Sequence, residues 1–170
     1  MIQRAIPLLH YRSWSGLVAA VLLVPASTPA RADNTMTLNA NVTRSCNLGA
    51  LPMMFGTVSI INPRVDVTAA MFIDCTPGTA FTVTMDNGLH FQAGDRRMEN
   101  PLANGARRYL SYEIYRNAAR TQRWGATPAT GITQTAPANG KVTLTAYGRV
   151  DDRRSAAGAY EDTVTVTITF

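Results

Sequence analysis

TVTVTITF, residues 163–170, carries the clearest structural signal in this chain. Threonine alternates there with an apolar residue without a break. Because successive side chains of a β-strand point to opposite faces of a sheet, this alternation predicts a strand with one buried face. The buried face is predicted to hold Val164, Val166, Ile168 and Phe170, while the threonines face the other way.

Other strand-like segments precede this one. Apolar positions alternate in AFTVTMD (residues 80–86), YLSYEIYRN (109–117) and KVTLTAYG (141–148). The segment AAMFIDC (69–75) is more uniformly apolar and predicts a central strand, and FGTVSI (55–60) is a further strand candidate. Almost every readable element of the chain is therefore a strand.

The gaps between these segments are rich in turn-forming residues. Asp86-Asn87-Gly88 and Asn139-Gly140 predict tight turns, because Asn and Gly tolerate positive φ. The stretch of small residues at 126–138 predicts a loop, and no helix of useful length is expected. Short, Thr- and Val-rich strands at this spacing predict an all-β chain folded as an antiparallel β-sandwich.

The first 32 residues have the pattern of a secretory signal peptide. Arg4 and Arg12 precede a short apolar run at 17–24, and Ala30-Arg31-Ala32 fits the small-x-small cleavage rule. The apolar run is short for a membrane span, so the exported chain is expected to start at Asp33 and to carry no membrane span. A retained membrane anchor is the alternative.

Composition narrows the function of the exported part. The whole chain has a formal charge of +5. Removal of the leader takes away three arginines and no acidic residue, so the formal charge of the exported part is +2. With no basic run interleaved with aromatics, binding to nucleic acid is not expected. His90 is the only histidine left, which leaves little material for a catalytic triad or a His-rich metal site. We therefore expect no catalytic residue, no metal and no cofactor.

Both cysteines, Cys46 and Cys75, lie in the exported part. In an oxidising compartment such a pair is most simply one structural disulfide, since a redox role would favour a C-x-x-C spacing. A bridge across about 30 residues would stabilise the fold by roughly 3–4 kcal/mol in the chain-entropy model.

A second alternating segment, TMTLNANVT (residues 35–43), follows the predicted cleavage site. It has two interpretations. It can pair within its own sheet as an ordinary first strand, or it can supply, in a different molecule, the strand that would follow residue 170 in a complete sandwich.

The order of these features resembles a known family. An alternating N-terminal segment is followed by Cys46, by FGTV (55–58), by Asp74-Cys75-Thr76 and by a closing GAYEDTVTVTITF (158–170). This order resembles the spore coat protein U domain family, which includes pilin subunits of the archaic chaperone–usher pathway. The resemblance covers essentially the whole exported chain.

The resemblance implies an immunoglobulin-like sandwich that lacks its last strand. It implies that a periplasmic chaperone first lends a strand to the open groove and that the N-terminal segment of the next pilin then replaces it, a form of β-strand addition. An outer-membrane usher is the further expected partner. Met36, Leu38, Ala40 and Val42 would be the inserting side chains of the donor. The tail side chains Val164, Val166, Ile168 and Phe170 would belong to the acceptor groove.

The sequence thus predicts three parts: a signal peptide (1–32), a donor segment (33–44) and an incomplete sandwich (45–170). The expected function is that of a structural subunit of a surface pilus that serves adhesion and biofilm formation. One alternative is a secreted coat or adhesive module that recognises a surface or sugar without forming a pilus. A periplasmic enzyme is a weaker alternative, because catalytic residues are scarce.

Overall fold

The computed structural model describes residues 34–59, 61–151, 153 and 155–170. The predicted leader, residues 1–32, lies outside the described residues. The chain divides into two units, Met1–Ala40 and Asn41–Phe170, and all the described strands belong to the second.

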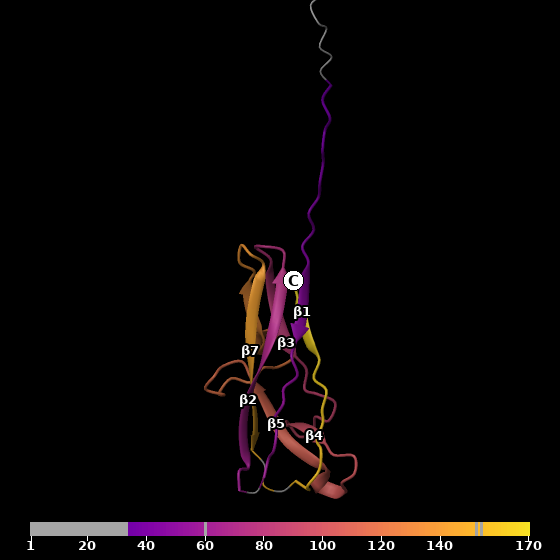
Figure 1. Cartoon of the computed structure of the whole chain (residues 1–170), viewed down its shortest axis with the longest axis vertical. Helices are drawn as coiled ribbons and strands as arrows, with labels where there is room; N and C mark the ends of the chain where they lie inside the picture. Colours follow the sequence, from indigo (N-terminus) through magenta and orange to yellow (C-terminus); the bar gives the residue numbers. More distant parts are fainter. Residues whose placement is uncertain (1–33, 60, 152, 154) are drawn as a thin grey trace, which may run out of the picture. The chain divides into compact units, whose positions relative to one another are not determined.

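The second unit contains two antiparallel sheets (Figure 1). One sheet has the strand order β1-β2-β7-β5-β4, and the other has the order β6-β3-β8. The strands are β1 (Cys46–Ala50), β2 (Arg64–Cys75), β3 (Ala80–Met85), β4 (Arg96–Glu99), β5 (Tyr109–Tyr115), β6 (Ile132–Thr135), β7 (Lys141–Asp151) and β8 (Val166–Thr169). Two 3₁₀ turns, η1 (Gly105–Arg108) and η2 (Pro128–Thr130), complete the described elements. The predicted all-β, antiparallel fold is confirmed.

The core lies between the two sheets and follows the alternation of the sequence. Phe81, Val83 and Met85 of β3 are buried against residues of β2, β5 and β7 from the facing sheet. Trp124 is fully buried in the same cluster, and its indole N–H donates to the Val83 carbonyl at 2.9 Å. A side chain from a loop therefore bonds to the central strand of the three-stranded sheet.

One charged side chain is also buried in this region. Arg96 of β4 has no exposed side-chain surface and donates to Glu113 and to the carbonyls of Asp86 and Trp124. Because a buried guanidinium is costly unless its donors are satisfied, these bonds fix the end of β3 and the Trp124 loop against β4 and β5.

Several sequence predictions about elements are confirmed. The patterns at 80–86, 109–117 and 141–148 correspond to β3, β5 and β7, and the segment 69–75 is the second half of β2, an interior strand. Both predicted turns place a glycine at positive φ, Gly88 at 79° and Gly140 at 72°. The disulfide is formed, and Cys46 and Cys75 are register partners on β1 and β2.

Two expectations are wrong. Residues 55–59 form no strand, because Gly56 has φ of 68° and no described strand pairs with them; Phe55 packs instead against Tyr112, with ring centroids 5.9 Å apart. The stretch 126–138 is more than a loop, since it contains η2 and β6.

Candidate functional site

The two described sheets together have four edge strands, β1, β4, β6 and β8. β1 ends the order of one sheet and pairs only with β2, and β8 ends the order of the other and pairs only with β3. The two strands lie close together, with some Cα atoms within 8 Å of each other (Figure 1). One edge of each sheet, that of β1 and that of β8, therefore lies on the same side of the sandwich.

The main-chain groups of the β8 edge can be assigned from neighbouring hydrogen bonds. The Thr165 carbonyl accepts from Asp86 N–H, and Thr165 N–H donates to the Asp86 carboxylate, both at 3.0 Å. In an antiparallel ladder the N–H and C=O of one residue point to the same side, and that side alternates from one residue to the next. The main-chain groups of Val164, Val166 and Ile168 therefore point to the free edge. Three consecutive binding positions are thus available for another strand.

The same argument applies to β1. The Ser45 carbonyl accepts from Thr76 N–H at 2.9 Å, and Leu51 N–H donates to the Ala70 carbonyl at 3.0 Å. Odd-numbered residues therefore bond to β2, and Cys46, Leu48 and Ala50 present their main-chain groups to the open side.

A cavity of about 490 Å³ lies beside these edges. Its two sides are the segment after β1 (residues 50–55) and the segment that leads into β8 (residues 160–166). Its floor consists of core side chains from both sheets, including Met71, Met85 and Ile114. We call this cavity the groove; it is an apolar site bordered by unused strand edges, which suits an extended apolar peptide.

A buried carboxylate holds one end of the groove. Asp162, whose side chain is 2% exposed, accepts from Tyr112 Oη at 2.6 Å and from Leu89 N–H at 3.0 Å, and its Oδ1 lies 3.0 Å from His90 Nδ1. A Cβ at position 88 would lie 2.1 Å from Asp162 Oδ2, so only Gly88 allows this approach. The segment leading into β8 is therefore tied across the groove to β5.

Tyr160 and Gly158 fix the same segment. The Tyr160 hydroxyl donates to the carbonyl of Ala156 at 2.7 Å and lies 2.9 Å from that of Arg107. A Cβ on Gly158 would lie 2.1 Å from Asn100 Nδ2. Each named residue of the Gly-x-Tyr-x-Asp sequence, residues 158–162, therefore helps to hold the closing segment in place.

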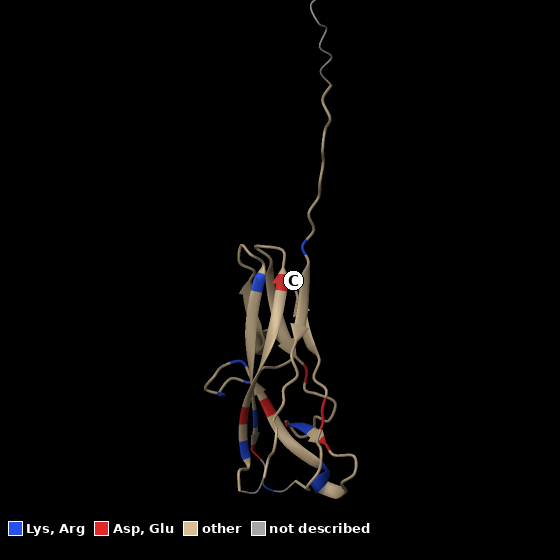
Figure 2. Ribbon diagram, in the orientation of Figure 1, with Lys and Arg blue, Asp and Glu red and all other residues tan. Residues whose placement is uncertain are grey.

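The electrostatics of this region follow from these contacts. Burial, together with the hydrogen bond to the Asp162 carboxylate, raises the pKa of Tyr112 well above its ordinary value. Burial of Asp86 opposes ionisation, but hydrogen bonds from Gly88 and Thr165 outweigh it and lower the Asp86 pKa. In Figure 2, most of the ribbon coloured for Lys, Arg, Asp and Glu lies around β4, β5 and the adjoining halves of β2 and β7.

The four predicted acceptor side chains differ in their surroundings. Val164, Val166 and Ile168 are half-buried and pack on the core, and Val164 and Val166 line the groove. Phe170 follows the last residue of β8 and is 53% exposed. The tail therefore has the predicted alternation, but its inner face is not fully covered.

The predicted donor side chains are exposed. Residues 34–45 form no strand, and Met36, Leu38 and Val42 are 83%, 85% and 81% exposed. The four donor positions therefore remain a prediction.

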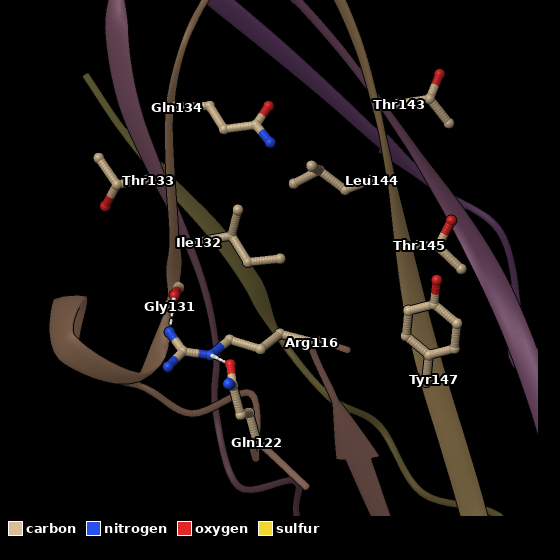
Figure 3. A pocket seen from close by; sticks show the side chains of 10 residues that line it. All are labelled: Arg116, Gln122, Gly131, Ile132, Thr133, Gln134, Thr143, Leu144, Thr145 and Tyr147. Carbon is tan, nitrogen blue, oxygen red and sulfur yellow. Dashed lines mark hydrogen bonds between the residues drawn. The ribbon is translucent and has the colours of Figure 1, made fainter. Parts of the chain in front are cut away.

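A second depression, of about 470 Å³, has a different character (Figure 3). Threonines, Gln134 and Tyr147 line much of it. Arg116 donates hydrogen bonds to the Gly131 carbonyl at 2.7 Å and to the Gln122 side-chain oxygen at 3.1 Å. This arginine fixes the loop around η2, and we assign the depression no function.

Within the described residues, no group of three or more His, Cys, Asp or Glu side chains is placed to hold a metal ion. None of the helices in that part of the chain has the length and apolar character needed to cross a membrane.

Similarity to solved structures agrees with this architecture. One similar structure is the crystal structure of the CsuC–CsuE chaperone–tip adhesion subunit pre-assembly complex from archaic chaperone–usher Csu pili of Acinetobacter baumannii. One chain of it matches with a TM-score of 0.60 and 26% identity, over 76% of this chain but only 40% of its own length. The E. coli Hda pilus minor tip subunit, HdaB, matches over 73% of this chain and 79% of its own, with 18% identity and a TM-score of 0.36, too low to support an argument.

Similarity in sequence is more extensive. Protein U of Myxococcus xanthus is 32% identical over 178 aligned residues, which cover 92% of this chain and 96% of that protein. The family model for the Spore Coat Protein U domain matches residues 32–167. The chain therefore belongs to the Spore Coat Protein U domain family.

Proposed function

We propose that the protein is a subunit of a surface pilus in which the N-terminal segment of one copy fills the groove of the next. One observation carries the proposal: an apolar groove is bordered by two unused strand edges in a chain that also has an exposed, strand-patterned segment. Family membership and the similarity to a complex from chaperone–usher pili support the coarser role of a pilus subunit.

The donor segment matches the groove in chemistry. Its apolar side chains at 36, 38, 40 and 42 share one face of a strand, and Asn and Thr occupy the other. Burying the three large ones would contribute roughly 5–9 kcal/mol before the cost of ordering the segment. A slip by one residue would turn Asn39 and Asn41 into the groove. The alternation therefore also favours registers in which the even-numbered residues face the groove.

Insertion requires a local rearrangement. Some Cα atoms of β1 and β8 are within 8 Å of each other, whereas a strand placed between two others needs about 9.5 Å. The donor must therefore part β1 from β8, and the groove between residues 50–55 and 160–166 offers it a wider place to start.

The same proposal names partners and location. An empty groove with two open edges is an aggregation hazard, which a periplasmic chaperone would cover by lending a strand. The Csu complex pairs a chaperone with a tip adhesion subunit, which supports this assignment. Export through the periplasm, passage through an outer-membrane usher, display on the cell surface, and roles in adhesion and biofilm formation complete the proposal, which involves no catalysis.

Deletion of residues 35–42 tests the donor role. We expect the shortened subunit to be exported and to bind its chaperone, because the groove is intact, but not to polymerise. Electron microscopy of cells and size-exclusion chromatography of the subunit give the two readouts. Fibres assembled from the shortened subunit would refute the proposal.

A single substitution gives a sharper test. Leu38→Asp should abolish fibres, because the groove would have to bury an unpaired charge. Asn39→Asp is the matched control: it adds the same charge one position along, on the face predicted to point outward, and fibres should still form. Equal assembly by both variants would place Leu38 outside the groove.

A coat-layer subunit is the second candidate. The nearly full-length match to Protein U and the name of the family favour it. Electron microscopy of cells with and without the gene separates the two, since a coat would give a continuous surface layer and a pilus would give filaments.

A further inference from the structure

The methionines of this chain converge on one place. There are seven, at positions 1, 36, 53, 54, 71, 85 and 98. Five of them, Met53, Met54, Met71, Met85 and Met98, line the groove. Of the other two, Met36 is one of the predicted donor side chains and Met1 lies in the predicted leader. Every methionine after the leader therefore lies either in the lining of the groove or in the predicted donor segment.

These five side chains come from four separate segments of the chain. Met71 on β2 and Met98 on β4 belong to one sheet, and Met85 at the end of β3 belongs to the other. Met53 and Met54 follow β1; Met53 is half-buried, and its Sδ would lie 2.3 Å from a Cβ on Gly148, whereas Met54 is 77% exposed. Thioether side chains thus contribute to the floor and to one side of the groove.

Methionine has a physical property that sets it apart from leucine or isoleucine. Its side chain is unbranched, with three rotatable bonds and a polarizable sulfur, so it fills gaps of different shape and is common at surfaces that bind several partners. Branched side chains have fewer low-energy shapes and define a pocket more narrowly.

We infer that the methionine lining makes the groove tolerant of donor sequence, so that it accepts extended strands whose apolar side chains differ in size and branching. This inference rests on the proposed function, which requires one groove to take a chaperone strand first and a subunit strand later. The occupant is an extended strand with apolar side chains at every second position. The methionine lining determines how much the apolar side chains of this strand can differ in size and branching.

The test compares the wild-type lining with a leucine lining of similar volume. The host is the full chain carrying Leu38→Asp, so that its own segment does not fill the groove. The second form adds Met71→Leu, Met85→Leu and Met98→Leu. The probes are four fluorescent peptides of residues 33–44: the native sequence and the single changes Met36→Leu, Leu38→Phe and Val42→Leu. Fluorescence anisotropy gives each dissociation constant.

We expect the four peptides to bind the methionine-lined groove within about fivefold of one another, because flexible thioethers refit around each side chain. On the leucine-lined groove we expect a spread of about 10–200-fold, the range that one methylene produces in a defined pocket. Leu110→Met, which changes a buried residue outside the groove, should leave the spread at the wild-type value.

The outcomes separate the two proposals. If the native peptide does not bind the methionine-lined groove, the proposed function fails. If it binds but both linings give the same spread, only the methionine inference fails. Should the triple variant not fold, the single variants Met85→Leu and Met53→Leu provide the same comparison, and each is expected to widen the spread.

Discussion

At the scale of single residues, Asp162 links the two sides of the groove. Its carboxylate is nearly inaccessible and is held by groups from β5 and from the loop after β3. Sequence periodicity could not identify it, because these partners are 50 and 73 positions away along the chain. The only sequence signal was its place in the Gly-x-Tyr-x-Asp pattern.

Asp162→Ala should lower the free energy of unfolding by about 3 kcal/mol, because the Tyr112 hydroxyl and the Leu89 N–H would each lose a buried partner. Urea denaturation followed by circular dichroism measures this. The neighbouring exposed side chain provides the control: Glu161→Ala should change stability by no more than about 0.5 kcal/mol. Equal losses from the two variants would contradict the assigned role of Asp162.

Asp86 should make stability depend on acidity. Its folded pKa lies below the unfolded value, so it contributes stability that is present above about pH 4 and is lost as the pH falls through the folded pKa. Asp86→Asn should therefore flatten the decline of the urea midpoint below pH 4. An unchanged slope in that variant would mean that other carboxylates cause the acid sensitivity.

At the scale of elements, the strands that alternate clearly were predictable from sequence. β3, β5 and β7 carry buried apolar residues at every second position, and the register of the core follows from that pattern. β4 was missed because it has four residues, RRME, and buries an arginine. β6 was missed because it is short and mostly polar, with its inner position held by Ile132. Short edge strands depend on tertiary partners more than on their own pattern.

The groove itself was predictable only through the resemblance. The alternation of residues 163–170 indicated a strand with one inner face, and the family pattern indicated that a neighbour strand was absent. The segment 50–55 gave no sign of lining a cavity, because Met53 and Phe55 lie there by contact with Gly148 and Tyr112 rather than by pairing in a sheet.

The disulfide should stabilise β1, the strand that borders the groove. Replacing both Cys46 and Cys75 by serine should lower the free energy of unfolding by roughly 3–4 kcal/mol, since the bridge closes a separation of 29 residues. Hydrogen exchange at Asn47 and Gly49, whose main-chain groups face β2, should become faster in the variant, while exchange at β7 stays slow. Protection of β1 equal to that of the wild type would show that β1 is held by β2 alone.

At the scale of the whole molecule, filling the groove should raise stability. Residues 33–44 can be removed from the front and attached after Phe170 through a flexible linker, which supplies the donor at high effective concentration. We expect the free energy of unfolding to rise by roughly 3–5 kcal/mol, the part of the burial term that remains after the donor is ordered. Urea denaturation compares this form with the untethered chain.

The matched control is the same rearranged chain with Leu38→Asp in the attached segment. It should be no more stable than the chain without a donor. A gain of equal size in both rearranged chains would show that the attachment, and not the apolar face of the donor, causes the effect.

The convergence of methionines on the groove also supplies a spectroscopic reporter. Each of the five carries a terminal methyl group that can be labelled with ¹³C, and their resonances would all originate from one region of the protein. Arrival of a strand should shift several of them together, while signals from other labelled side chains stay in place. Occupancy of individual subunits could then be followed in solution without any attached dye.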